Sequence, residues 1–284
     1  MVSPHVVVSA TSINLNYLSY VPLFSKSLQT FTDAELVLGI ISHRNQFENL
    51  VYQLNDYVRT VVIEPDLGVD PGVQAKYSRL VLACDPEFTD RRVSIADLDL
   101  VQLNDRRWSA LADFSGDCVI KWGYDHPSYY EEANLGKWPM DGTTALGKVF
   151  QRIVNPDHLS RPALLESWAI LRGDGRENPY LPFGVFSDES LLRTLFATSS
   201  LSSNGVSRKA IDRAPMSGRL DKSQTIRPFT RSRLRSGFYS EMHGFRPFNS
   251  SANYGLAVLS HLGISRREYI SFLSDLRHNL GSGI

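Results

Sequence analysis

Short apolar runs and helical stripes alternate along the first part of the chain. Four runs rich in β-branched or other apolar residues have the pattern of buried strands: residues 6–10, 35–41, 58–63 and 92–97. Between them, apolar positions recur at helical spacing over three stretches: residues 17–31, 44–57 and 70–84. This alternation predicts an α/β fold with a mixed, mostly parallel, Rossmann-like sheet flanked by helices.

The second half has a weaker pattern. Residues 122–147 are rich in Trp and Tyr and read as a loop, and the helical stretches are residues 161–172 and 188–197. Ser265 and Glu268 have the spacing of a capping box, which predicts the start of a last helix.

Residues 207–236 form a strongly basic segment. They include nine basic and two acidic residues and have little apolar periodicity, so we expect a long mobile loop. Such a loop suits a lid over a diphosphate, or a contact with an acidic or lipid-phosphate acceptor. Phe229 is its single aromatic residue, whereas single-strand nucleic-acid sites usually interleave aromatic and basic side chains. We therefore expect no nucleic-acid partner.

Composition places few further limits on the protein. The 284 residues fit one α/β domain, and the formal net charge of zero gives no global attraction to nucleic acid or to an anionic membrane. Cys84 and Cys118 are too few for a disulfide scaffold or a cysteine-rich zinc site, which fits a reducing compartment. We find no apolar run of about 18 residues and no basic leader, so we expect no transmembrane segment and a cytoplasmic location.

An acidic pair, Asp97-Leu98-Asp99, comes directly after the fourth expected strand. Ligands of open α/β sheets bind at the carboxyl ends of the strands, so the position of the pair matters as much as its chemistry. Two carboxylates at such a turn can hold a divalent cation, and a cation can neutralise the charge of a diphosphate leaving group. A solvated turn explains the same residues without any function, so the surrounding motifs decide between the two interpretations.

Those motifs resemble the GT-A glycosyltransferases, in particular the retaining glycogenin and galactosyltransferase-like group. Val6–Ala10 and Asn14–Leu18 resemble the first strand and the loop that touches the nucleotide. Lys76–Leu80 resembles the Tyr-x-Arg segment that precedes the Asp-x-Asp motif, and Asp97–Asp99 matches that motif.

Two further segments extend the resemblance toward the C-terminus. Phe186–Leu192 resembles the acidic segment of that group's reaction site. Met242–Phe248 resembles its His-x-Gly-x-x-Lys-Pro-Trp motif, with a shorter spacing and with Arg246 and Phe248 in place of Lys and Trp. The resemblance implies a single GT-A domain over residues 1–284. In it, residues 1–104 bind the nucleotide-sugar and residues 105–284 bind the acceptor.

The resemblance also implies roles for individual residues. A Mn²⁺ or Mg²⁺ ion would be held by Asp97, Asp99 and His243. The UDP- or GDP-sugar would be contacted by Ala10, Thr11, Asn14, Tyr17, Arg79, Asp97 and Arg246. Asp188 and Glu189 are the candidate catalytic acids, and a glycan or another hydroxyl compound would be the acceptor.

Each of these roles has a plainer alternative. Asp188 and Glu189 suit the first turn of a helix for electrostatic reasons alone. Arg79 could pair with a surface acid, and His243 could be an ordinary loop histidine. The aromatic side chains within 122–147 could line an acceptor groove or fill a core.

Other classes of protein fit less well. A dinucleotide-binding dehydrogenase needs a Gly-rich turn after the first strand, but no glycine occurs before Gly39. A P-loop motif is also missing, as is the Gly-rich, basic N-terminal loop of sugar nucleotidyltransferases. A carbohydrate- or nucleotide-sugar-binding protein with a GT-A fold and no turnover stays open.

Overall fold

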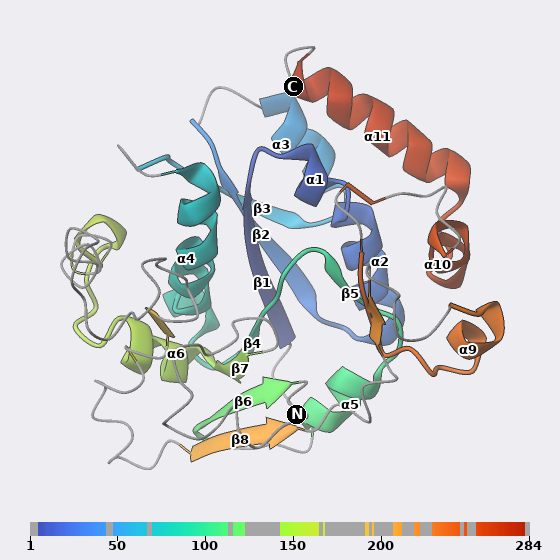
Figure 1. Cartoon of the computed structure of the whole chain (residues 1–284). Helices are drawn as coiled ribbons and strands as arrows, with labels where there is room; N and C mark the ends of the chain where they lie inside the picture. Colours follow the sequence, from blue (N-terminus) through green and yellow to red (C-terminus); the bar gives the residue numbers. More distant parts are fainter. Residues whose placement is uncertain are drawn as a thin grey trace, which may run out of the picture.

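The computed structural model describes the following residues: 5–43, 48–66, 70–112, 116–122, 143–164, 167, 191–192, 195, 207–211, 219–221, 229–244, 247–248 and 254–281. Figure 1 shows a central sheet with helices on both faces and a smaller sheet beside it. Within this part of the chain, no helix is both long and apolar enough to cross a membrane.

The larger sheet has seven strands. Their order across the sheet is β3 (Arg59–Ile63), β2 (Glu35–Ile41), β1 (His5–Ser12), β4 (Arg92–Ile95), β7 (Thr143–Leu146), β6 (Cys118–Trp122) and β8 (Ser207–Ile211). Strand β7 pairs antiparallel with both of its neighbours, and the other pairs are parallel. The carboxyl ends of β1, β2, β3 and β4 therefore meet at one edge.

A second sheet of three short strands stands beside the first. Its order is β5 (Leu100–Gln102), β10 (Glu241–His243) and β9 (Arg219–Asp221), with β10 antiparallel to β5 and parallel to β9. Four residues separate the end of β4 from the start of β5, and the acidic pair belongs to this link between the two sheets.

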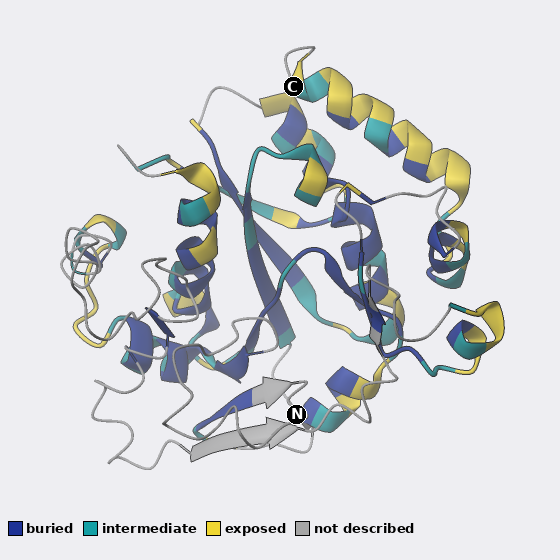
Figure 2. Cartoon of the chain, viewed as in Figure 1, coloured by how far each residue is buried: buried dark blue, intermediate teal, exposed yellow. Residues whose placement is uncertain are grey.

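Two apolar layers cover the larger sheet. Alternate residues of β1 point to opposite layers, so that Val7 belongs to one and Val6 and Val8 to the other. The first layer is built by α1 (Leu15–Leu18), α2 (Val21–Phe31), α3 (Glu48–Asn55), α5 (Arg106–Ala112), α9 (Arg231–Arg235), α10 (Gly255–His261) and α11 (Arg266–Leu280). The second is built by α4 (Pro71–Ala83), the short η1 (Pro86–Phe88) and α6 (Gly147–Val154). Figure 2 shows the buried strands of the centre and the exposed outer face of α11.

The predicted fold class is confirmed, and most element boundaries are close to those expected. Strand β2 spans the whole predicted run, and α4 begins at Pro71 after its N-cap Asp70. The capping box of the last helix is present, with Glu268 N donating to Ser265 Oγ over 3.1 Å. The helix expected over 17–31 is instead two helices, because the chain turns at Ser19 and Tyr20.

The prediction of one long loop over 207–236 is wrong. Three elements lie within this range: β8, β9 and α9. The two strands are held by backbone pairing with β6 and β10. Such pairing requires no regular spacing of apolar residues, so the sequence shows no periodic pattern there. Two helices are predicted before this segment, over residues 161–172 and 188–197. In these two ranges, residues 161–164, 167, 191–192 and 195 are helical, and the other positions lie outside the described residues.

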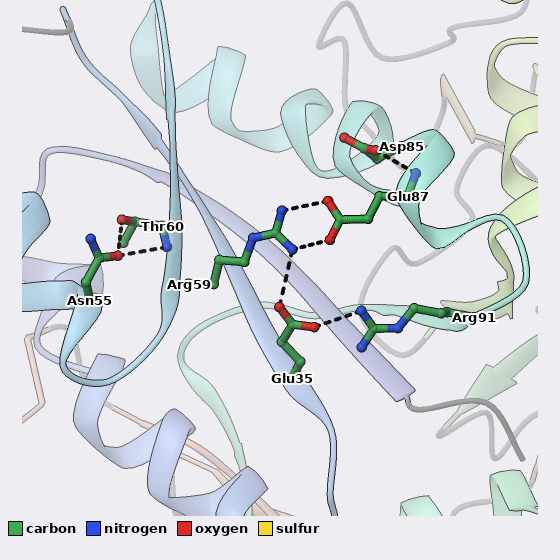
Figure 3. Close-up of polar contacts among 7 residues, drawn as sticks. All are labelled: Glu35, Asn55, Arg59, Thr60, Asp85, Glu87 and Arg91. Atoms are coloured by element: carbon green, nitrogen blue, oxygen red, sulfur yellow. Dashed lines mark hydrogen bonds and ion pairs between the residues drawn. The ribbon is translucent and has the colours of Figure 1, made fainter.

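The edge formed by the amino ends of β2 and β3 is held by ion pairs (Figure 3). Arg59 binds both carboxylate oxygens of Glu87 and also approaches Glu35, whose other oxygen lies 2.8 Å from Arg91. The hydrogen bond with Arg59 holds the pKa of Glu87 below its usual value. A hollow of about 460 Å³, partly lined by Glu35 and Arg59, opens at this edge. It lies opposite the carboxyl ends where the acidic pair sits.

Candidate functional site

The acidic pair lies at the carboxyl edge of the larger sheet, next to the end of β1. Strands β1 and β4 are neighbours with Val8 beside Ile95, and Ala96 N donates to Val8 O over 3.0 Å. The chain then turns, with Leu100 N donating to Asp97 O over 3.0 Å, and enters β5. Leu98 is buried in the apolar core and anchors this turn. The two aspartates are thus fixed between the two sheets.

Asp97 is paired with Arg79 of α4. The guanidinium Nη1 donates to Asp97 Oδ1 and lies 3.4 Å from Ala96 O. Only 8% of the Arg79 side chain is exposed, against 37% for Asp97. Arg79 is therefore a buried cation at the strand ends, and the acid with which it pairs is the half-exposed Asp97. It places a positive charge at the edge where a diphosphate is expected.

Asp99 is brought to His243 by the smaller sheet. His243 lies opposite Leu100 in the antiparallel pairing of β5 and β10, and Gly244 N donates to Asp99 O over 3.2 Å. As a result, His243 Nε2 lies 3.2 Å from Asp99 Oδ2. Asp99 is completely buried, and the His243 side chain is 18% exposed. Residues 144 positions apart in the sequence thus form one contact.

The Asp99–His243 pair has the chemistry of part of a metal site. Carboxylate oxygen and imidazole nitrogen are both ligands of Mn²⁺, and Mg²⁺ takes carboxylates in octahedral geometry. However, the described residues contain no group of three His, Cys, Asp or Glu side chains arranged to hold a metal. Asp97 is turned toward Arg79, so its role as a metal ligand stays a prediction.

The expected nucleotide-contacting residues of the first strand lie near the same edge. Ala10 and Thr11 belong to the carboxyl end of β1, where Thr11 is buried and its Oγ1 donates to Ser12 O over 2.9 Å. Asn14 caps α1 by accepting a hydrogen bond from Asn16 N over 2.9 Å. Tyr17 of α1 is half-buried. Their contact with a nucleotide stays a prediction.

Several predicted residues lie outside the described part of the chain. These are Asp188, Glu189, Arg246 and residues 123–142 of the aromatic stretch.

Three further ionisable residues lie at or just after strand ends and were not selected from the sequence. His43 follows β2 and Glu64 follows β3 at the carboxyl edge, and their side chains lie 3.3 Å apart and largely exposed. Asp221 occupies the β9 position that pairs with His243 of β10. His43 and Glu64 each follow a predicted strand, so their positions in the sequence could have identified them as residues of the carboxyl edge. The pairing of Asp221 left no such signal, because β9 is three residues long.

Comparison with solved structures identifies the fold. A galactosyltransferase, LgtC, in complex with donor and acceptor sugar analogues, superposes with a TM-score of 0.51 over 94% of this chain and 99% of its own. The sequence identity is 14%. This chain has the GT-A fold of LgtC. The LgtC variant Q189E gives a TM-score of 0.50 at 15% identity, over 93% of this chain and 99% of its own.

Sequence comparison adds nothing to this result. No family model matches the chain, and no curated protein has a significantly similar sequence. The glycosyltransferase GlyE of Streptococcus pneumoniae TIGR4 is a weaker match, with a TM-score of 0.46 at 12% identity over 96% of this chain and 63% of its own. The resemblance to the galactosyltransferase-like group is thus confirmed at the level of the fold.

Proposed function

We propose that this chain is a metal-dependent glycosyltransferase. It transfers a sugar from a UDP- or GDP-sugar to a hydroxyl group of a glycan or another acceptor, with retention of configuration at the sugar. The observation that carries the proposal is the contact between Asp99 and His243 beside the Arg79–Asp97 pair, at the carboxyl edge of a GT-A sheet. Free thiols at Cys84 and Cys118 suit a reducing compartment, so a cytoplasmic location is part of the proposal.

The proposed donor site uses charge at the strand ends. Asp99 and His243, with Asp97, would hold Mn²⁺ or Mg²⁺, which neutralises charge on the departing diphosphate when bound. Arg79 supplies a second positive charge, and the planar guanidinium suits phosphate oxygens. Because Arg79 is buried, it can offer this charge at little cost in side-chain entropy. Ala10, Thr11, Asn14 and Tyr17 would contact the nucleotide, and Arg246 the diphosphate.

The transfer itself exchanges one bond at the sugar for another. The bond between the anomeric carbon and the diphosphate oxygen breaks, and the acceptor oxygen bonds to that carbon. With retention, the proton of the acceptor hydroxyl passes to the departing diphosphate, which leaves on the same face of the sugar. Asp188 and Glu189 are then proposed to orient the acceptor. With inversion, one of them would take the proton as a general base.

The experiment is a panel of UDP- and GDP-sugars, incubated with the protein in Mn²⁺ and in EDTA. Slow hydrolysis of one donor that requires metal and is lost in Asp99→Ala would support the proposal and name the donor. The matched control is Asp117→Asn. This residue pairs with Arg152 at the amino end of β6, on the opposite edge of the sheet.

Two other outcomes count against the proposal in different ways. Metal-dependent binding without hydrolysis, in the presence of a broad acceptor mixture, would favour a nucleotide-sugar-binding protein with no turnover. Binding to no donor would refute the proposal, and Asp97–Asp99 would then be a structural turn.

A further inference from the structure

Phe248 rests on the turn between α1 and α2. Phe248 N donates to Ser19 Oγ over 3.1 Å, and the Phe248 ring is 4% exposed. Its ring packs edge-on against Tyr20, with centroids 5.6 Å apart, and against Tyr269 of α11, with centroids 5.4 Å apart. Tyr269 in turn donates its hydroxyl to Ser19 O over 3.1 Å. Phe248 is therefore anchored on Ser19 and Tyr20.

Gly244, which follows His243 directly, lies against the same Tyr20. A Cβ atom added to Gly244 would lie 2.1 Å from Tyr20 Oη and 2.9 Å from Tyr20 Cζ. The Tyr20 hydroxyl thus occupies the space that a side chain at position 244 would need. Tyr20 is completely buried, so it has little room to move away.

Gly244 connects this contact to the candidate site. It follows His243 directly, and its N–H donates to the carbonyl oxygen of Asp99 over 3.2 Å. A shift of the backbone at Gly244 would therefore move His243 and weaken the pairing of β10 with β5. The separation of His243 Nε2 from Asp99 Oδ2 depends on that pairing.

We propose that Tyr20 is a positioning residue, which acts through Gly244 to set the imidazole of His243 against the carboxylate of Asp99. The consequence for metal binding rests on the function proposed above, whereas the placement of His243 does not. A residue that only filled the core would affect stability alone. A positioning residue also changes the environment of His243.

The first test uses metal-free protein and the ¹H–¹³C NMR signal of the His243 ring, assigned by its loss in His243→Gln. Gly244→Ala is expected to shift or broaden this signal. Adding Tyr20→Phe removes the contact at 2.1 Å but leaves the ring carbon Cζ at 2.9 Å, so the double variant is expected to recover part of the way toward the wild-type position. The matched control is Gly147→Ala, where an added Cβ would lie 2.0 Å from Phe88 O, on the other face of the sheet. It should lower stability and leave the His243 signal in place.

The inference is overturned if Gly244→Ala leaves the His243 signal unchanged, or if the double variant is as perturbed as Gly244→Ala. If Gly244→Ala does not fold, Tyr20→Phe alone serves instead, since it removes the hydroxyl that lies against Gly244. The same shift of the His243 signal is expected, and its absence would overturn the inference.

A Mn²⁺ titration then links the position to the function. Changes in residues that orient a metal ligand typically weaken metal binding about 10–100-fold, and Gly244→Ala should fall in this range, with partial recovery in the double variant. A wild-type protein that binds no Mn²⁺ would refute the proposed function, whereas the NMR comparison would still decide the role of Tyr20.

Discussion

His5 makes the stability of this protein sensitive to acid. It is the first residue of β1, where its Nε2 lies 2.7 Å from Ser94 Oγ and its ring meets the Trp108 ring edge-on at 4.9 Å. The pKa of His5 is lowered from 6.5 to about 3. Burial is the largest cause, followed by the positive charges of Arg107, Arg92 and Arg91.

The sign of the effect follows from the direction of the shift. The unfolded chain takes up a proton at His5 near pH 6.5, whereas the folded chain resists it until about pH 3. The stability that the neutral imidazole contributes is fully present above pH 6.5, and it is lost progressively as the pH falls from 6.5 toward 3. One unit of pKa shift is worth about 1.4 kcal/mol, so lowering the pH from 7 to 5 should remove up to about 2 kcal/mol through His5.

The assay is thermal unfolding at pH 7 and pH 5 for the wild type and for His5→Gln, which keeps a hydrogen-bonding group near Ser94 but does not titrate. A loss of about 2 kcal/mol corresponds to a drop in Tm of roughly 4–8 °C for a domain of this size class. The wild type should lose that much more than the variant between the two pH values, because the other titrating groups are common to both. Equal pH dependence in the two proteins would refute the reasoning.

Three further predictions concern other parts of the fold. Glu87→Gln breaks an exposed ion pair with Arg59, so the free energy of unfolding measured with urea should fall by only about 0.2–1 kcal/mol, and by less at high salt. A loss well above about 1 kcal/mol would contradict this expectation. Ser265→Ala removes the N-cap of α11 and should cost about 1 kcal/mol in the same measurement, while Ser265→Thr should retain most of it. Arg79→Ala should weaken nucleotide-sugar binding about tenfold or more in calorimetry, and unchanged affinity would remove Arg79 from the donor site.

The first half of the fold was readable from the sequence because its signals are local. Strand β2 is a continuous apolar run, and α4 carries its own N-cap and first-turn proline. Each of these elements is specified by neighbouring residues, so periodicity alone locates it to within a few positions. The break between α1 and α2 was missed because it depends on Ser19 and Tyr20, whose partners lie near the C-terminus.

The candidate site was less readable, because its contacts join distant segments. Strands β5, β9 and β10 have three residues each, too few to show a period, yet their pairing brings His243 to Asp99. The family resemblance pointed to His243. The spacing of the motif, however, did not determine the register of β10 against β5, which places His243 beside Asp99. The pairing of Arg79 with Asp97 depends on how α4 crosses the sheet, and no pattern within α4 encodes it.

The most direct test of the central claim is anomalous diffraction from crystals grown with Mn²⁺ and the nucleotide diphosphate of the best donor. We predict a manganese peak in contact with Asp99 and His243, with the diphosphate on its open side near Arg79. A peak elsewhere, or none at a concentration where the nucleotide is bound, would contradict the account.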